Sequence, residues 1–185
     1  MSPLLWIVLA AVAVVFVGGV WMYNRLVTYR TRAENGWSQI DVQLRRRYDL
    51  IPNLVEAVKG YAAHERELFE RIAEARAGAM AAEGVGSQAR AENEVTSNLR
   101  QLLAVVENYP ELKANQNFLA LQEELTATES KIAYARQFYN DQVMKLNTAI
   151  GTFPSNMIAK AFGFDEREFF EIDEPARGPV QVELG

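Results

Sequence analysis

The sequence predicts an all-α protein, in which a single N-terminal transmembrane helix precedes an up-and-down four-helix bundle with long antiparallel helices. Two observations predict this fold class. Residues 3–22 form an uncharged apolar run that no later part of the chain repeats. After Arg25 the apolar residues recur at spacings of three and four, which is typical of amphipathic helices that pack side by side. Such helices need partners in water, and a bundle with short connections provides them.

The apolar run has the length of a membrane span, because 20 helical residues rise about 30 Å, the thickness of the hydrocarbon core. Aromatic residues near its two ends fit the aromatic belts of membrane helices: Trp6, Trp21 and Tyr23. A cleaved signal peptide and a buried core helix are the alternatives, but the run is long and no Lys or Arg precedes it. We therefore expect residues 1–24 to be a retained anchor, in which residues 3–22 contact membrane lipid.

The distribution of Lys and Arg predicts the orientation. None precedes the run, whereas six Arg and only two acidic residues follow it closely: Arg25, Arg30, Arg32, Arg45, Arg46 and Arg47, with Glu34 and Asp41. The positive-inside rule then places the body of the protein in the cytoplasm and the short N-terminus outside.

Composition limits the chemistry that the body can perform. The chain has no Cys and a single His, His64, which excludes disulfides, thiolate chemistry and zinc–sulfur sites. Residues 1–164 carry 17 bases and 17 acids, whereas residues 165–185 carry two bases and seven acids. A neutral body argues against nucleic-acid binding, which needs a basic face. We expect residues 25–164 to form the bundle domain and residues 165–185 to form an acidic, disordered tail.

The first body helix is expected to continue from the anchor. Its apolar stripe begins at Leu26 and recurs at positions 33, 37, 40, 44 and 48. The pattern breaks near Pro52, which lacks an N–H and suits a first helical turn, with Asp49 as a candidate N-cap. A chain reversal at this point is the preferred interpretation, and a kink is the alternative.

Three further helices follow in the prediction. The second covers about 53–79, and the Gly-containing stretch 77–91 after it predicts a mobile loop. The third covers about 92–108 and ends at a turn over 110–115. The fourth would be about 55 Å long, and it carries the most regular stripe: Phe118, Leu121, Leu125, Thr128, Ile132, Ala135, Tyr139, Val143, Leu146, Ile150 and Phe153.

In an up-and-down topology the fourth helix returns to the membrane, so the segment after it lies near the bilayer. This segment is FPSNMIAKAFGF, residues 153–164, and four of its residues share one face of a short helix: Met157, Ile158, Ala161 and Phe162. Two interpretations stay open. The segment either caps the end of the bundle core or lies on the membrane as an interfacial helix.

The sequence contains no recognisable reaction centre. A di-iron bundle needs Glu-x-x-His on two helices, and the single His64 does not form HExxH because position 68 is Leu. We therefore expect no catalytic, cofactor-binding or metal-binding residues. Polar residues at or near the stripes are expected to fix helix register: Arg47, Glu65, Thr128 and Asn140. The run Arg45–Arg47 is interpreted as a solvated juxtamembrane cluster, with lipid phosphate as an alternative ligand.

Four stretches resemble the LemA family of bacterial membrane proteins. They are WSQIDVQLRRRYDLIPNLVEAVKGYA (37–62), NYPELKANQNFLALQEEL (108–125), YNDQVMKLN (139–147) and FPSNMIAKAFGF (153–164). The resemblance implies an N-terminal transmembrane helix, an up-and-down helical bundle and a location in the cytoplasmic (inner) membrane with a short outer N-terminus. It brings no catalytic residues.

The favoured function is a non-enzymatic, membrane-anchored scaffold or adaptor that contacts other proteins or copies of itself, since exposed Tyr, Phe and Met are common at interfaces. A lipid-binding or membrane-shaping protein is the alternative, and it would use Arg45–Arg47 and residues 153–164. An enzyme is the third class, and it lacks any cluster of titratable residues with motif spacing.

Overall fold

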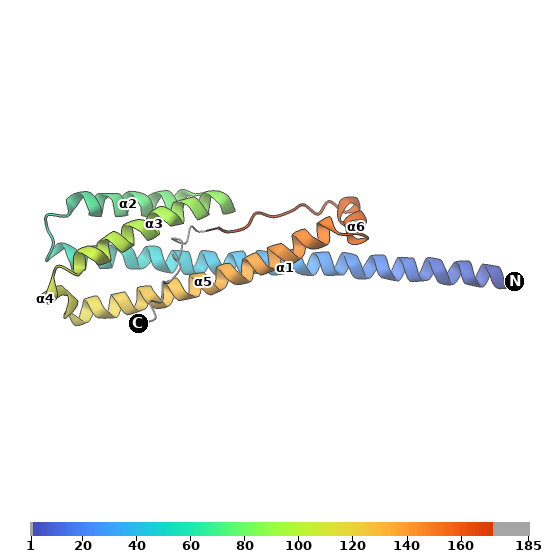
Figure 1. Cartoon of the computed structure of the whole chain (residues 1–185), viewed down its shortest axis with the longest axis horizontal. Coiled ribbons are helices and arrows are strands. Elements are labelled where there is room, and N and C mark those ends of the chain that lie inside the picture. The colour runs from blue at the N-terminus through green and yellow to red at the C-terminus, as the bar shows by residue number, and fades with distance from the viewer. Residues whose placement is uncertain (1, 172–185) are drawn as a thin grey trace, which may run out of the picture. The chain divides into compact units, whose positions relative to one another are not determined.

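The structure is a computed structural model that describes residues 2–171. Within these residues the chain forms helices and no strand, so the predicted all-α class is confirmed (Figure 1). The helices are α1 (Pro3–Lys59), α2 (Arg66–Ala81), α3 (Val85–Val106), α4 (Pro110–Lys113), α5 (Gln116–Gly151) and α6 (Ser155–Ala161). They contribute to two compact units. Of the described residues, unit 1 contains 2–47 and 126–169, and unit 2 contains 48–125, 170 and 171.

The predicted anchor is the first part of α1, a helix of 57 residues. Its large apolar side chains are exposed from Leu4 to Val17, and α1 is long and apolar enough to cross a membrane. The helix then continues without a break into the body. The expectation that the anchor and the first body helix are one element is therefore confirmed.

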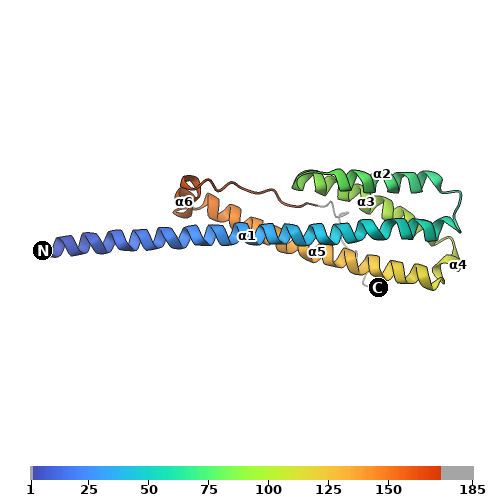
Figure 2. The same cartoon turned by 180° about the vertical axis from the view of Figure 1, so that it is seen from behind.

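Unit 1 is built on α1 and α5, which run side by side in opposite directions in both views (Figures 1 and 2). The predicted stripes of both helices are buried at this contact, for example Leu26 and Ile40 on α1 and Tyr139 and Val143 on α5. A glycine permits the close approach. A Cβ added at Gly36 would lie 3.1 Å from the Cα of Tyr139, which is tighter than ordinary van der Waals contact.

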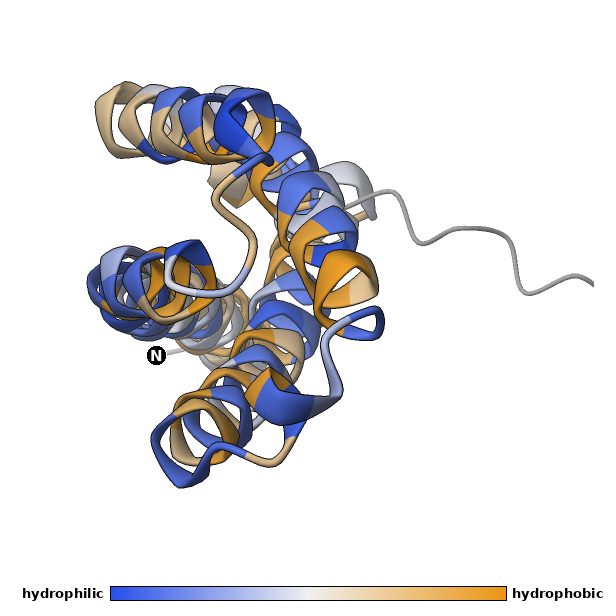
Figure 3. Cartoon of the chain, turned by 90° about the vertical axis from the view of Figure 1, so that its left-hand side faces the viewer, coloured by the Kyte–Doolittle hydropathy of each residue, from blue (hydrophilic) through white to orange (hydrophobic). Residues whose placement is uncertain are grey.

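Unit 2 contains four helical segments, namely the end of α1, α2, α3 and the start of α5, together with the short α4. Residues 26–47, most of the first predicted body helix, belong to unit 1 instead. Hydrophobic and hydrophilic stretches alternate along these ribbons in the end-on view (Figure 3), as amphipathic helices require. The buried side chains include Leu54, Ile72, Leu102 and Phe118.

The predicted chain reversal at Pro52 is wrong, because Pro52 lies inside α1 and Asp49 is an exposed residue of the same helix rather than an N-cap. A proline cannot donate to the carbonyl four residues earlier, which here belongs to Tyr48. In unit 2 that carbonyl accepts a hydrogen bond from a side chain instead, since Nε of Arg76 donates to Tyr48 O at 2.7 Å. A long-range hydrogen bond thus replaces the missing backbone bond and lets the helix continue.

The chain reverses instead at residues 60–65, directly after Lys59 ends α1. Backbone N–H groups of Tyr61 and Ala62 both donate to Val58 O, and the turn buries Ala62 completely. Glu65 occupies the N-cap position of α2, so the helix predicted over 53–79 is divided by this turn. His64 is exposed and belongs to this turn.

The predicted mobile loop over 77–91 is also wrong. α2 extends to Ala81 and α3 starts at Val85, so only residues 82–84 connect them. The Ala residues of this stretch favour helix, and two of them, Ala79 and Ala89, are buried. The tight connection uses Gly84, whose φ of 84° lies in the left-handed region that favours glycine.

The second half of the prediction is closer to the structure. α3 and α5 lie where they were expected, although α3 starts earlier and the turn at 110–115 contains α4. The Asn115 side chain caps α5, accepting hydrogen bonds from the N–H groups of Asn117 at 2.9 Å and Phe118 at 3.3 Å. Of the predicted α5 stripe, Phe153 falls outside the helix and is 79% exposed.

After α6 an extended segment is fastened along unit 1. The Asn147 side chain donates to Arg167 O at 2.9 Å and accepts from Arg167 N at 3.0 Å, and Tyr139 donates to Glu168 O at 2.9 Å. Arg167 also pairs with Glu34 at 2.6 Å. The first residues of the predicted tail are therefore held in place. Its remainder, from residue 172, lies outside the described residues.

Candidate membrane-interface site

Unit 1 has a region beside the end of the apolar run that carries only basic charge. We call residues 19–32 of α1 and residues 142–164 together the juxtamembrane collar. The collar has no Asp or Glu, and it contains five bases: Arg25, Arg30, Arg32, Lys145 and Lys160. All five are exposed, and none forms an ion pair with another of the residues 2–171. The collar therefore offers uncompensated positive charge.

The α6 helix packs against the last turns of the apolar run. A Cβ added at Gly19 would lie 3.8 Å from Cδ1 of Ile158. The Tyr23 ring lies 4.8 Å from the Phe162 ring and 5.9 Å from the Phe164 ring, measured between centroids. Because Gly19 belongs to the predicted span, α6 lies beside α1 where the span ends.

The segment 153–164 has an inner and an outer side. Ala159 and Phe164 are buried with Leu26 and Leu146, so the inner side caps the core of unit 1 at this end. On the outer side three large apolar side chains are exposed by more than 60%: Phe153, Met157 and Phe162. The inner side of the segment therefore caps the core. The exposed apolar outer side is the part that an interfacial helix would place in the membrane.

The turn between α5 and α6 satisfies the last carbonyl groups of α5. The Ser155 hydroxyl donates to Ala149 O at 2.7 Å and to Thr152 O at 3.0 Å, and the Thr152 hydroxyl donates to Thr148 O at 2.7 Å. The C-terminal carbonyls of a helix carry partial negative charge. These hydroxyl groups reduce that charge beside the collar.

Arg25 is the most constrained base of the collar. Its Nε donates to the Tyr29 hydroxyl at 2.8 Å, and its guanidinium carbon lies 5.4 Å from the ring centroids of both Trp21 and Tyr29. Cation–π contacts of this kind hold a guanidinium without neutralising its charge. Arg30 is held similarly, 5.0 Å from the Phe164 ring centroid.

A pocket of about 460 Å³ opens beside Arg25, between α1, the end of α5 and the turn to α6. Trp21, Met22 and Phe153 line one part of it, and Arg25 and Lys145 line another. The wall is thus partly aromatic and partly cationic.

A second hollow, of about 510 Å³, lies farther along the α1–α5 pair and is called here the α1–α5 groove. Its wall includes Val42, Tyr134 and Phe138, which are 57%, 75% and 40% exposed. Gln43 also lines the groove, and its buried Oε1 accepts no hydrogen bond from the residues described. Such an apolar, aromatic hollow is typical of a protein-contact surface.

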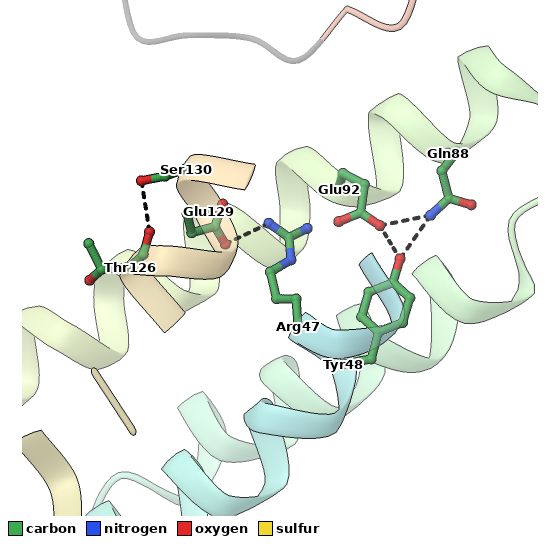
Figure 4. Close-up of polar contacts among 7 residues, drawn as sticks. All are labelled: Arg47, Tyr48, Gln88, Glu92, Thr126, Glu129 and Ser130. Atoms are coloured by element: carbon green, nitrogen blue, oxygen red, sulfur yellow. Dashed lines mark hydrogen bonds and ion pairs between the residues drawn. The ribbon is translucent and has the colours of Figure 1, made fainter. Parts of the chain in front are cut away.

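The structure changes the interpretation of Arg45–Arg47. Because α1 is continuous, Arg45 lies about 30 Å along the helix from Arg25, at 1.5 Å per residue. Arg45 pairs with Asp41 at 3.1 Å, and Arg47 is fully buried and pairs with Glu129 at 2.8 Å (Figure 4). Arg47 is therefore an internal residue of unit 1, and the solvated juxtamembrane interpretation is wrong for it.

Unit 2 contains a buried polar cluster that the sequence analysis missed. The Tyr48 hydroxyl donates to Oε1 of Glu92, and Nε2 of Gln88 donates to the same oxygen at 2.7 Å and to the Tyr48 hydroxyl at 2.9 Å (Figure 4). Glu92 is 0% exposed. A signal was present, because Glu92 lies three residues before Val95 and seven before Leu99, in register with the apolar stripe of α3.

The other polar residues predicted to fix helix register differ in how deeply they are buried. Thr128 is buried, Asn140 is half-buried, and Glu65 lies half-buried in the turn before α2. Within residues 2–171, no three or more His, Asp or Glu side chains gather as metal ligands. The expectation that the chain has no catalytic, cofactor-binding or metal-binding residues stays a prediction.

Comparison with known proteins identifies the family. The sequence model of the LemA family matches residues 36–184. Magnetosome proteins MamQ 2 and MamQ 1 of Paramagnetospirillum magneticum are each 27% identical over 180 residues, which cover 83% of this chain and 66% of those proteins. Protein LemA of Metamycoplasma hominis is 24% identical over 160 residues, which cover 86% of this chain and 73% of that protein. This chain thus spans slightly less than two thirds of the length of the MamQ proteins. Because the family match covers most of the chain, and because α1 begins with a run able to cross a membrane, this chain is a membrane-associated member of the LemA family.

Proposed function

We propose that the protein is a non-enzymatic, single-pass scaffold or adaptor of the inner membrane that presents a cytoplasmic helical bundle to other proteins, with a second copy of itself as the first partner. The observation that carries the proposal is the α1–α5 groove, where Val42, Tyr134 and Phe138 are exposed together. Aromatic side chains in a hollow are the usual anchors of protein contacts. The non-enzymatic part of the proposal rests on the sequence, which has no catalytic motif.

A second copy is the preferred occupant because of how the chain is anchored. Anchoring confines all copies to one plane with one orientation, which raises their effective concentration at each other's grooves. A two-fold contact would place the groove of one copy on the groove of the other.

The proposed orientation has the N-terminus outside and both units in the cytoplasm. Arg25, Arg30 and Arg32 follow the span within ten residues, and no acidic residue lies among them. A reporter enzyme fused after Gly185 should be active in the cytoplasm. Reporter activity confined to the outer side would overturn the orientation.

Self-association is tested with a photoreactive amino acid placed at Tyr134 of the full-length protein in native membranes. Ala133 is the matched control, because it is exposed on the same helix but points about 100° away from Tyr134 and away from the groove. A cross-linked dimer from position 134 and none from position 133 supports the proposal. Equal cross-linking from both positions, or a strict monomer after detergent extraction at high protein concentration, contradicts it.

A second candidate function, lipid binding at the membrane surface, is favoured by the juxtamembrane collar. Five bases without an acid would attract anionic lipid, and the exposed Phe153, Met157 and Phe162 would enter the interfacial region. The chain lacking residues 1–24 should sediment with phosphatidylglycerol vesicles and not with phosphatidylcholine vesicles, provided its circular dichroism shows the expected helix. Absence of binding to both kinds of vesicle would remove this candidate.

A further inference from the structure

We propose that the pocket beside Arg25 is a specific site for the headgroup of an anionic phospholipid, with the phosphate between Arg25 and Lys145 and the acyl chains leaving past Trp21 and Phe153. This inference rests on the lipid-binding function proposed above. It goes further, because it replaces a diffuse attraction by one defined site.

The pocket has the polarity of a lipid. Along α1 its wall runs from Trp21 and Met22, at the end of the apolar run, to Arg25 and Tyr29. The helical rise from Trp21 to Tyr29 is about 12 Å. Along the antiparallel α5 the order is reversed, so Lys145 lies toward the body and Phe153 toward the span. Both walls therefore change from apolar to cationic in the same direction, as an amphiphilic ligand requires.

The cationic end has no internal counterion. Lys145 forms no ion pair within the described chain, and Arg25 is held by two aromatic rings and one hydroxyl, which leave its charge in place. The nearby hydroxyl groups of Thr152 and Ser155 already donate to the α5 carbonyls of Thr148 and Ala149, and Arg25 and Lys145 are the charged groups of the pocket that can bind an anion. A guanidinium that is already positioned loses little freedom when it binds a phosphate.

Size and location favour a lipid over a free anion. A volume of about 460 Å³ is in the range of small-molecule sites and far exceeds one phosphate ion. The apolar end opens beside the last turn of the span, where acyl chains are present and free anions are excluded. In the proposed orientation the site faces the cytoplasmic leaflet, where anionic lipids provide the phosphate.

The test uses the full-length protein in detergent micelles with added lipid, and native mass spectrometry measures bound lipid. The pocket variant is Arg25→Gln with Lys145→Gln. The control variant is Arg32→Gln with Lys160→Gln, which removes the same charge from the collar but does not line the pocket. Each base is worth about a fivefold change near a membrane surface, so we expect the pocket variant to bind phosphatidylglycerol about 30-fold more weakly, with the control nearly unchanged.

The experiment distinguishes a defined lipid site from lipid binding by the whole collar. Equal losses in both variants would overturn the defined site and leave lipid binding by the whole collar. No preference of the unaltered protein for phosphatidylglycerol over phosphatidylcholine would overturn both. Inorganic phosphate is the second ligand tested, and displacement of the bound lipid by phosphate alone would overturn the lipid assignment in favour of a free-anion site. Circular dichroism of both variants controls for folding.

Discussion

The pocket of unit 1 and the polar cluster of unit 2 use similar side chains in opposite ways. In the pocket, Arg25 and Lys145 are exposed and no acidic residue belongs to the collar. In unit 2, Glu92, Tyr48 and Gln88 are buried and hydrogen-bonded to one another. Buried polar groups that satisfy each other fix a packing arrangement, whereas exposed charges without a counterion are available to a ligand. We therefore expect the cluster to contribute to stability, and we propose binding for the pocket.

The largest expected effect tests whether the Glu92 cluster stabilises unit 2. Glu92→Ala removes the common acceptor of Tyr48 and Gln88 and leaves both donors buried. We expect the free energy of unfolding to fall by about 3 kcal/mol, measured by urea unfolding in detergent. Glu94→Ala changes the same charge on the exposed side of α3 and should cost less than about 0.5 kcal/mol. Similar costs for the two variants would contradict the assignment of the cluster to stability.

The next effect concerns the carbonyl of Tyr48, which Arg76 satisfies in place of Pro52. Arg76→Met should lower the free energy of unfolding by about 2 kcal/mol, because a hydrogen bond from a charged donor is lost. In a Pro52→Ala background the backbone N–H at position 52 takes over this carbonyl, so the same change should cost markedly less. A double-mutant cycle by urea unfolding measures the coupling. Additive effects would show that the Arg76 bond does not compensate for the proline.

A pair of glycines sharpens the contrast between the units. Gly36→Ala in unit 1 would place a Cβ 3.1 Å from the Tyr139 backbone, and we expect a loss of about 1–2 kcal/mol. Gly78→Ala in α2 meets nothing within 4 Å, so the higher helix propensity of alanine should stabilise unit 2 by up to about 1 kcal/mol. Thermal unfolding followed by circular dichroism should therefore give shifts of opposite sign. Shifts of the same sign would mean that the α1–α5 contact is less tight than described.

The smallest effect is pH-dependent and belongs to unit 1. Burial raises the pKa of the Tyr139 phenol above its usual value of 10.0, with Arg167 lowering it and Glu168 raising it to smaller extents. The neutral phenol therefore stabilises the fold below about pH 10, the pKa of an unfolded tyrosine, and this contribution is lost as the pH rises through the higher folded pKa. Tyr139→Phe should cost about 1 kcal/mol at pH 8.

The difference between the unaltered protein and Tyr139→Phe should shrink above pH 10, as measured by urea unfolding at several pH values. Tyr134→Phe is the control, because Tyr134 is 75% exposed and should show neither the cost nor the pH dependence. A difference that grows with pH would contradict the neutral-phenol explanation.

The sequence predicted the elements whose stripes are continuous and failed where distant residues decide the local structure. The span, the stripe of α5 and the helical class follow from local periodicity. The continuation of α1 through Pro52 depends on Arg76, which lies 24 residues later and supplies a bond that no local pattern reveals. The same holds for the pocket, because only the antiparallel packing of α1 and α5 brings Arg25 and Lys145 to the same cavity.

The Gly-containing stretch 77–91 failed for a different reason. Its glycines predict flexibility, but its abundant alanines favour helix, and of the glycines in this stretch only Gly84 has a positive φ. The Glu92 cluster was within reach of the sequence, since an acidic residue in register with an apolar stripe requires buried partners. Its partner Gln88 was also within reach, because it lies four residues earlier in the same helix, whereas Tyr48 was not, because it lies 44 residues away.

Because α1 is unbroken, the number of residues between the span and the collar fixes both their separation and their rotation about the helix axis. A single residue inserted between Gly19 and Arg25 would rotate the preceding turns by about 100° relative to everything after the insertion. Ile158 would then no longer face Gly19, and the apolar side of the pocket would point away from its cationic side. A seven-residue insertion would restore the azimuth to within about 20° but lengthen the helix by about 10 Å. Azimuth and height at the lipid surface are thus fixed together by one uninterrupted backbone.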